Sequence, residues 1–350
     1  MNAGYQQVIA LDEKDRRDLF LATATRIGTT LQNIEKDFWV CWTLDALFHR
    51  LGAQRPRLLF KGGTSLSKAC GLIARFSEDI DVTVFRQDIG EATTVEELEA
   101  LGRKPRQTKL DAIRTACQGY IFGTLQGRIE TYGRDSLSAV GRDPTRFTVE
   151  ADPADADGQS LLIHYPSVAD AGGYVLPSVK IESGAKSALD PHHEKVVVPY
   201  LAQDLTDPDL LSVPGVTTID AERTFLDKVL ILHGMTHYFK AKGSLRGNGR
   251  MSRHYYDIYK LMGVPVGPNA CTNHALIQDS VRHARMFFYR NNTGLEVAEP
   301  GQFRLQPTKD MMGPLAEDYA AMSIMIFGEV PSFETVLAGV GAAEDRLNAS

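Results

Sequence analysis

The stretch from Leu58 to Phe85 constrains the fold of this chain more than any other. It begins with an apolar run, Leu58-Leu59-Phe60, which stops at Lys61 and a glycine pair, Gly62-Gly63. A short amphipathic segment follows, and a second apolar run starts at Asp79-Ile80-Asp81. Glycine pairs interrupt regular structure because glycine adopts backbone conformations that other residues avoid. The pattern predicts a strand, a glycine turn, a helix and a second strand.

Two aspartates open the second predicted strand. Side chains alternate between the two faces of a strand, so Asp79 and Asp81 project together while Ile80 and Val82 face the other way. Two carboxylates on one face form a hard oxygen site of the kind that binds Mg²⁺ or Mn²⁺. A solvated pair of acids would give the same pattern, and for the pair alone both interpretations stay open.

The glycine turn is a candidate anion site. Backbone N–H groups of Gly62 and Gly63 and the start of the following helix would face an anion, with Thr64 and Ser65 as additional donors. Gly-Gly-Thr alone is usually only a turn. Its combination with the aspartate pair across one strand–helix–strand unit favours a metal–nucleotide site. The turn is not a Walker loop, because Gly-x-x-x-x-Gly-Lys-Ser/Thr does not occur in this chain.

Two motifs of this stretch resemble a known family. They are Lys61-Gly62-Gly63-Thr64 and Arg75-Phe76-Ser77-Glu78-Asp79-Ile80-Asp81. Both are similar to the signature of the nucleotidyltransferase fold shared with DNA polymerase beta, and more closely to the AbiEii/AbiGii-type toxin family, which includes the mycobacterial MenT toxins. Three further segments resemble family segments: Glu35-Lys36-Asp37-Phe38-Trp39-Val40, Thr224-Phe225-Leu226-Asp227-Lys228-Val229 and Arg253-His254-Tyr255-Tyr256-Asp257-Ile258-Tyr259. The resemblance implies an α+β fold, with a polymerase-beta-like domain of mixed sheet flanked by helices and a C-terminal helical domain.

Length and composition agree with a two-domain globular protein. A chain of 350 residues exceeds the length at which single cores tend to divide. We place the boundary at Pro214-Gly215, which gives a nucleotidyltransferase domain over 1–214 with N-terminal helices and a helical domain over 215–350. The chain has no long apolar run and no basic leader, so neither a membrane span nor a signal peptide is expected. Four scattered cysteines indicate free thiols in a cytoplasmic protein.

Periodicity outside the central stretch predicts further elements. Helices are expected over 12–26, 31–50, parts of 93–126, from Asp220 onward, from Arg253 onward, and over 275–289, 311–327 and 333–347. Strands are expected at 147–149, 161–165, 175–182 and 196–198. Within the helix over 31–50, the charged cluster Glu35-Lys36-Asp37 is expected to face solvent, and only the family resemblance leaves a role near the site open.

The resemblance assigns roles to residues outside the central stretch. Glu182 ends an apolar strand pattern and is expected to be the third metal ligand, although it could be only a charge on an edge strand. Lys228 is expected to contact nucleotide phosphates, although an exposed lysine along a helix would have the same spacing. Asp257 is carried over as a residue needed for activity, although it could form only an i,i+4 pair with Arg253. His254 stands where many relatives carry an acid.

A cationic stretch follows Val229, since no Asp or Glu occurs between it and Tyr256. It is predicted to be a flexible loop that contacts an RNA backbone, with a solubilising loop as the alternative. Its basic residues are Lys240, Lys242, Arg246, Arg250 and Arg253. A second basic group is expected on a helix surface, with polyanion contact left open: Arg103, Lys104, Arg106, Lys109 and Arg114.

These features predict metal-dependent transfer of a nucleotide from an NTP. Asp79, Asp81 and Glu182 would hold the metal, and Lys61 and Lys228 would neutralise phosphate charge. We expect Glu182, Lys228 and Asp257 to point toward the aspartate pair. By resemblance, the acceptor is the 3′ end of a tRNA or another RNA, and transfer blocks translation. The chain would then be the toxin of a toxin–antitoxin or abortive-infection system with a cognate antitoxin. A small-molecule nucleotidyltransferase of the antibiotic-modifying kind and a catalytically silent nucleotide-sensing protein stay open as alternatives.

Overall fold

The chain is described by a computed structural model over residues 2–169, 176–245 and 250–349. It divides into two compact units. The first comprises Met1–Cys70, Phe76–Thr93 and Gln107–Thr218, and the second comprises Gly71–Arg75, Thr94–Arg106 and Ile219–Ser350. The second unit therefore includes two segments from the earlier part of the chain. As a domain boundary, Pro214-Gly215 stays a prediction.

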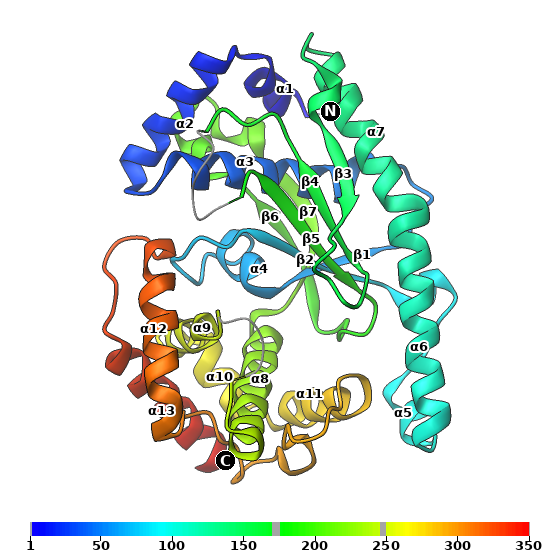
Figure 1. The fold of residues 1–350 in the computed structure, drawn as a ribbon, viewed down its shortest axis with the longest axis vertical. Coiled ribbons are helices and arrows are strands. Elements are labelled where there is room, and N and C mark those ends of the chain that lie inside the picture. Colours follow the sequence, from blue (N-terminus) through cyan, green and yellow to red (C-terminus); the bar gives the residue numbers. More distant parts are fainter. Residues whose placement is uncertain (1, 170–175, 246–249, 350) are drawn as a thin grey trace. The chain divides into compact units, whose positions relative to one another are not determined.

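A mixed sheet forms the centre of the first unit (Figure 1). Within the described residues its strands are β1 (Leu58–Lys61), β2 (Asp79–Val84), β3 (Thr148–Ala151), β4 (Ser160–His164), β5 (Ser178–Gly184), β6 (His192–Val197) and β7 (Val213–Ile219). Their order is β3-β4-β5-β2-β1-β7-β6. β1 pairs antiparallel with β2 and parallel with β7, and β2 pairs parallel with β5. The predicted mixed sheet is confirmed.

Helices make up most of the remaining described residues. They are α1 (Ala3–Ala10), α2 (Glu13–Ile27), α3 (Leu31–Asp45), α4 (Gly62–Lys68), α5 (Val95–Glu99), α6 (Arg103–Tyr120), α7 (Gln126–Ser138), α8 (Ala221–Lys242), α9 (Ser252–Met262), α10 (Val266–Thr272), α11 (His274–Phe287), α12 (Met312–Met322) and α13 (Phe333–Ala349). The predicted strand–turn–helix–strand unit is confirmed as β1, α4 and β2. None of the helices in the described parts of the chain combines the length and the apolar character of a membrane span. The four cysteines are free thiols, and all but Cys70 are buried.

Helix α3 is buried on nearly all sides and packs against β5. It continues as a π-helical turn, η1 (Ala46–Arg50), so the helix reaches Arg50 as predicted. The expectation that Glu35-Lys36-Asp37 faces solvent is wrong, because their exposed fractions are 1%, 3% and 3%. Five consecutive apolar residues, Phe38–Trp42, make this helix apolar all round, and such a helix is buried. The three charged residues are buried with it.

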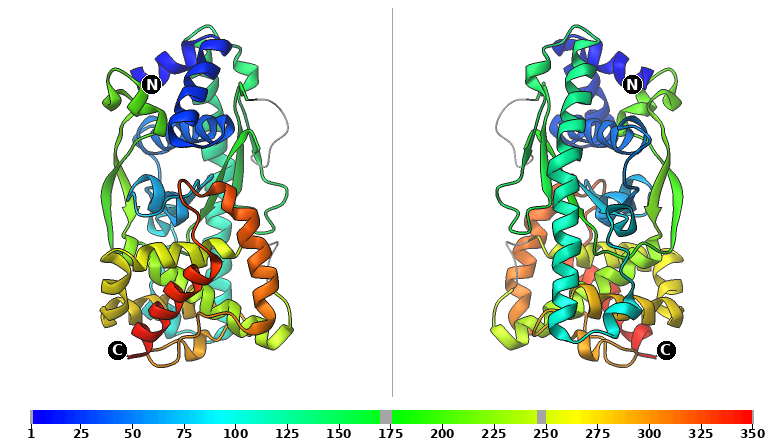
Figure 2. Two further views of the ribbon diagram at one scale, coloured as in Figure 1. Left: turned by 90° about the vertical axis from the view of Figure 1, so that its left-hand side faces the viewer. Right: turned by 90° about the vertical axis from the view of Figure 1, so that its right-hand side faces the viewer.

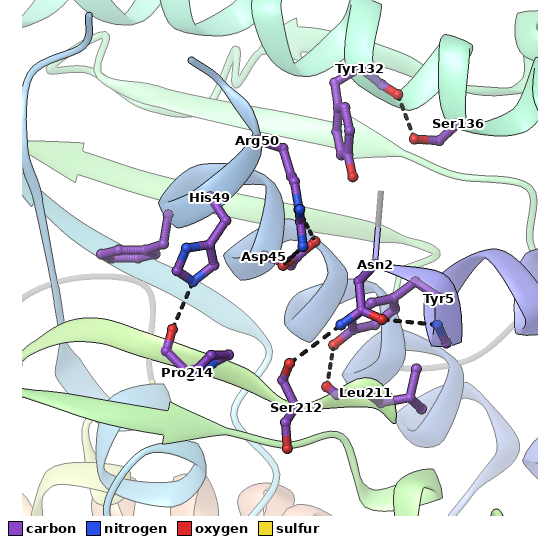
Figure 3. A network of polar contacts seen from close by, with 12 residues as sticks. Asn2, Tyr5, Asp45, His49, Arg50, Tyr132, Ser136, Leu211, Ser212 and Pro214 are labelled. Carbon is purple, nitrogen blue, oxygen red and sulfur yellow. Dashed lines mark hydrogen bonds and ion pairs between the residues drawn. The ribbon is translucent and has the colours of Figure 1, made fainter. Parts of the chain in front are cut away.

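Strand β7 was not predicted from the sequence. The segment before it contains two short 3₁₀ helices, η5 (Tyr200–Asp204) and η6 (Pro208–Leu211). Polar contacts connect this region to α1 and to η1 (Figure 3). The Tyr5 hydroxyl donates to the Leu211 carbonyl at 3.1 Å, and His49 Nε2 lies 2.7 Å from the Pro214 carbonyl. Pro214 and Gly215 interrupt the alternating pattern of this strand, because both residues are depleted in strands.

Residues 107–138 of the first unit run as one long helix, formed by α6, the π-helical turn η3 (Ile121–Leu125) and α7 (Figure 2). Helix α7 packs against β3. Gly133 faces this contact, because a Cβ at this position would overlap the Phe147 ring. In contrast, a Cβ at Gly127, one and a half turns earlier, would meet no atom within 4 Å.

The second unit is predominantly helical, as predicted for the C-terminal part of the chain. Helix α9 packs against α8, α12 and α13, and α11 packs against α8 and α5. Asp220 occupies the N-cap position of α8, which confirms the predicted start of this helix. At its other end, Gly243 adopts a left-handed conformation with φ of 70° and ends the helix.

Replacement of Gly133 by alanine is expected to destabilise the protein by about 1–3 kcal/mol, because the added methyl group must displace the Phe147 ring. Gly127→Ala is the matched control in the same helix. It adds a methyl group in open space and is expected to raise stability by up to about 1 kcal/mol, the helix preference of alanine over glycine. Chemical denaturation of both variants checks this. Equal shifts for the two would contradict the packing of α7 on Phe147.

Candidate active site

Charged side chains gather on one face of the sheet where β1, β2 and β5 pair. Asp81 is opposite Lys61 on one side and opposite Glu182 on the other, and Asp79 is opposite Lys180. Residues opposite one another in paired strands point to the same face. The strand register therefore places Asp79, Asp81 and Glu182 on a common face, as the sequence predicted for the aspartate pair.

Gly62 fits directly against this face. Its φ is 78°, in the left-handed region that favours glycine, and a Cβ at this position would overlap the Asp81 carboxylate. Beside it, Lys61 Nζ lies 3.9 Å from Asp81 Oδ1. The glycine turn thus lets the backbone approach Asp81 closely, and Lys61 adds a positive charge there.

The two hydroxyl residues after the glycine pair hold the turn together. Thr64 Oγ1 is hydrogen bonded to Ser77 Oγ at 2.8 Å and to the Asp79 carbonyl, and Ser65 Oγ donates to the Gly62 carbonyl at 2.9 Å. Both residues are buried. Thr64 therefore links α4 to the first residue of β2. Phosphate binding by Thr64, Ser65 and the glycine pair stays a prediction.

The Asp79 carboxylate has neither an ion pair nor a hydrogen bond with any residue that the structure describes. Partial burial and the negative charges of Glu78 and Glu182 raise its pKa to about 6, with a smaller contribution from Asp81. A carboxylate in this setting is stabilised by a bound cation.

Asp79 and Asp81 fit a divalent cation that is shared with a substrate. Within residues 2–169, 176–245 and 250–349, no three His, Cys, Asp or Glu side chains are arranged to bind a metal on their own. Mg²⁺ commonly takes one or two protein carboxylates and completes its shell with water and substrate phosphates. Glu182 forms an ion pair with Lys180 at 2.8 Å, and Lys180 also pairs with Asp152 at 3.0 Å. Glu182 as the third metal ligand stays a prediction.

A buried ion cluster in the second unit contains Lys228 and Asp257. Arg75 Nε and Nη2 donate to the two Asp257 carboxylate oxygens at 2.7 and 2.8 Å, and Lys228 Nζ lies 2.9 Å from Oδ2. Asp257 is fully buried and Lys228 is 5% exposed, so the alternative of an exposed lysine is wrong. Burial by itself would raise the pKa of Asp257, but Arg75 and Lys228 hold it well below its ordinary value. The pairing is with Arg75 and Lys228, rather than with Arg253 one turn away.

Positive charge exceeds negative charge around this carboxylate. Arg253 and His254 lie on the first turn of α9, and burial together with Lys228 and Arg253 lowers the pKa of His254 well below its ordinary value. His254 is therefore neutral at pH 7. Direct roles of Lys228 and Asp257 in catalysis, and their convergence on Asp79 and Asp81, stay predictions.

The predicted cationic loop is shorter than expected. Lys240 and Lys242 are exposed on the last turn of α8, and Arg253 lies on α9, so these three are not loop residues. Lysines are favourable at this position because they complement the helix dipole and the free carbonyls there. Arg250 is exposed, and its N–H donates to Asp318 at 2.6 Å. Arg246 lies outside the described residues.

A mixed sheet that presents paired aspartates beside a glycine turn is the arrangement of a nucleotidyltransferase. The sequence profile described as "Nucleotidyl transferase AbiEii toxin, Type IV TA system" matches residues 45–339. The chain therefore belongs to the AbiEii family of nucleotidyltransferase toxins, and the predicted family is confirmed. Toxins of this family act in two-component systems with an antitoxin.

One solved structure with the same fold is MenT4, a nucleotidyltransferase toxin from Mycobacterium tuberculosis. The two chains are 14% identical, with a TM-score of 0.50, and the alignment covers 95% of this chain and 90% of MenT4. At this identity the likeness concerns the fold, and it confirms the predicted fold class. No curated protein matched the sequence.

Replacement of Asp257 by asparagine is expected to destabilise the protein by about 3–5 kcal/mol, because Arg75 and Lys228 would keep their charges in a buried site. Because the pKa of Asp257 is lowered in the folded protein, its contribution to the free energy of unfolding is present above about pH 4 and is lost as the pH falls further. Chemical denaturation as a function of pH measures both effects.

The control variant is Glu99→Gln, which weakens an exposed ion pair with Arg282 in the same unit. Little change is expected there, since exposed pairs contribute little. A difference between wild type and Asp257→Asn that persists undiminished at pH 2 would contradict the role of the ionised carboxylate.

Proposed function

We propose that this protein transfers a nucleotide from an NTP to RNA, with the 3′ acceptor end of tRNA as the preferred acceptor. The observation that carries the proposal is the pairing of Asp79 and Asp81 on one sheet face, with Gly62 fitted against Asp81 and no protein partner on the Asp79 carboxylate among the described residues. Membership of the AbiEii family supports the reaction class.

In this proposal Asp79 and Asp81 hold Mg²⁺ or Mn²⁺, with Glu182 as the candidate third ligand. When bound, the divalent ion supplies Lewis-acid stabilisation of the phosphates. The acceptor hydroxyl attacks the α-phosphorus, the bond between the α- and β-phosphates breaks, pyrophosphate leaves and the hydroxyl proton passes to solvent. Lys61 is placed beside Asp81 to neutralise phosphate charge, and the backbone N–H groups of the glycine turn orient the leaving group.

Lys228 and Asp257 would act as a unit in this reaction. Lys228 is proposed to stabilise charge on the nucleotide phosphates, and Asp257 holds its ammonium group in place through the 2.9 Å ion pair. Because Asp257 is fully buried, its proposed contribution passes through Lys228 and Arg75. Positioning and electrostatics account for most of the rate in phosphoryl-type transfers, so no covalent nucleophile is needed.

An RNA acceptor is supported by the basic residues that follow Val229. Lys240, Lys242 and Arg250 are exposed, and no acid occurs between Val229 and Tyr256 to oppose them. Exposed lysines of this kind contact phosphate backbones in a salt-dependent way. Modification of tRNA in the cytoplasm would block translation, and a cognate antitoxin would restrain the enzyme.

Incubation with each α-labelled NTP, Mg²⁺ and total tRNA is expected to place label on RNA, and chelation of the metal to abolish transfer. Asp79→Ala and Asp81→Ala should each lower the rate by at least about 1,000-fold, the effect of removing a group that stabilises the transition state. Glu150→Ala is the matched control, an exposed acid on β3 of the same sheet, and should be as active as wild type.

Absence of transfer by the wild type, or undiminished transfer by Asp81→Ala, would contradict the proposal. Transfer of label to an aminoglycoside-like small molecule in place of RNA would assign the protein to the antibiotic-modifying class. Nucleotide binding without transfer would favour a nucleotide-sensing protein.

Gly62→Ala is expected to reduce kcat/KM by about 100-fold or more, because the added methyl group displaces the Asp81 carboxylate. Gly90→Ala is the control for backbone strain. Gly90 also has a positive φ, 82°, but a Cβ there meets no atom within 4 Å. It should lose about 1 kcal/mol of stability and keep its activity. Steady-state transfer kinetics compare the two, and equal activities would show that the close approach of Gly62 to Asp81 is unimportant.

A further inference from the structure

Two neighbouring residues of α3, Lys36 and Asp37, form separate buried ion pairs in the first unit. Lys36 Nζ lies 2.8 Å from Glu78 Oε2, and Asp37 Oδ1 lies 2.7 Å from Lys68 Nζ. The exposed fractions of the four side chains lie between 3% and 10%. The buried face of α3 thus carries a positive and a negative charge side by side, each with a partner of opposite sign.

The partners of these two residues flank the candidate active site. Lys68 is the last residue of α4, the helix that begins with the glycine pair. Glu78 immediately precedes Asp79, the first residue of β2. Neighbouring residues of one helix therefore contact both the end of the glycine-turn helix and the start of the aspartate strand.

The Lys68 pair has further partners that fix its geometry. Lys68 Nζ lies 3.5 Å from the centre of the Tyr200 ring, within the range of a cation–π contact. The Tyr200 N–H donates to Asp37 Oδ2 at 2.7 Å. Both carboxylate oxygens of Asp37 are thus hydrogen bonded, one to the ammonium group and one to the backbone. These contacts hold the end of α4 in place against α3.

Stability alone does not account for these charges. A buried ion pair contributes little more to stability than a well-packed apolar pair of the same volume, because the desolvation of both charges offsets their attraction. What an ion pair adds is direction, since it is favourable only when donor and acceptor atoms meet at hydrogen-bond distance. Two such pairs constrain α4 and the start of β2 more narrowly than apolar contacts would.

We propose that Lys36 and Asp37 are positioning residues for the transfer reaction. They hold α4 and the first residue of β2 in the arrangement that keeps Gly62 against Asp81 and turns Asp79 toward the substrate. The inference rests on the proposed function for the reaction that is positioned. The hydrogen bonds of Thr64 to Ser77 and Asp79 connect the same two elements from the other end of α4.

The first test removes both charges of one pair. The double variant Lys36→Met/Glu78→Gln is expected to keep a thermal midpoint close to that of wild type, while kcat for transfer from labelled NTP to total tRNA falls about 100-fold, the cost of a displacement near 1 Å. The KM for NTP should change by less than about threefold, because the double variant leaves Lys61 and the glycine turn in place. A folded double variant with the kcat of wild type would overturn the proposal.

A second variant serves if the double variant does not fold. Lys36→Arg keeps the charge but donates from a different position, so a folded protein with about tenfold lower kcat is expected. Unchanged kcat in Lys36→Arg would count against the proposal. The matched control is Arg134→Met/Glu130→Gln, which removes a 2.7 Å ion pair on the exposed surface of α7 and should leave kcat unchanged.

Hydrogen exchange tests the same inference without any activity. In Lys36→Met/Glu78→Gln, peptides covering 79–84 should exchange faster than in wild type, while those covering 62–68, which Asp37 still holds through Lys68, and those covering α7 should change little. Unchanged exchange over 79–84 would overturn the positioning role even in a protein with no measurable transfer. Absence of transfer in wild type, with the expected exchange pattern, would instead contradict the proposed function alone.

Discussion

The antiparallel pairing of β1 with β2 sets the Gly62 α-carbon against the carboxylate of Asp81. The left-handed backbone of Gly62 and the missing side chain are both needed for this approach, since any Cβ would overlap the carboxylate. The position of Asp81 is therefore defined by backbone, which moves less than side chains. The charged groups on the same sheet face, Lys61 and Glu182, take their places from the register of these strands.

Several buried charges in the described residues are paired with a charge of opposite sign, and Asp79 is an informative contrast. Lys36 and Asp37 each meet a charge of opposite sign, and Asp257 is held by two cations. Each of these charges would otherwise carry a desolvation cost of several kcal/mol. The Asp79 carboxylate has no such partner in the described parts of the chain, although it is half-buried and lies near other acids. A cation shared with a bound nucleotide is the partner that suits it.

Local patterns were enough to predict most secondary structure. The glycine pair between two apolar runs predicted β1, α4 and β2. Apolar residues spaced three and four positions apart predicted a helix from α3 through Arg50. The aspartate pair followed from the alternation of side chains along β2 alone. The same reasoning missed β7, because Pro214 and Gly215 interrupt its pattern and its place in the sheet depends on pairing with β1.

The sequence by itself determined the family, the glycine turn and the shared orientation of Asp79 and Asp81, because these depend on residues close together in the chain. Tertiary structure alone decided which charges are buried and what they contact. Lys36 contacts Glu78, which lies 42 residues away in the sequence, and Arg75 contacts Asp257, which lies 182 residues away. The apolar run Phe38–Trp42 indicates a buried helix, but nothing in the local pattern shows which opposite charges Lys36 and Asp37 contact. Those contacts form only when the chain brings an opposite charge to hydrogen-bond distance and removes the water around both.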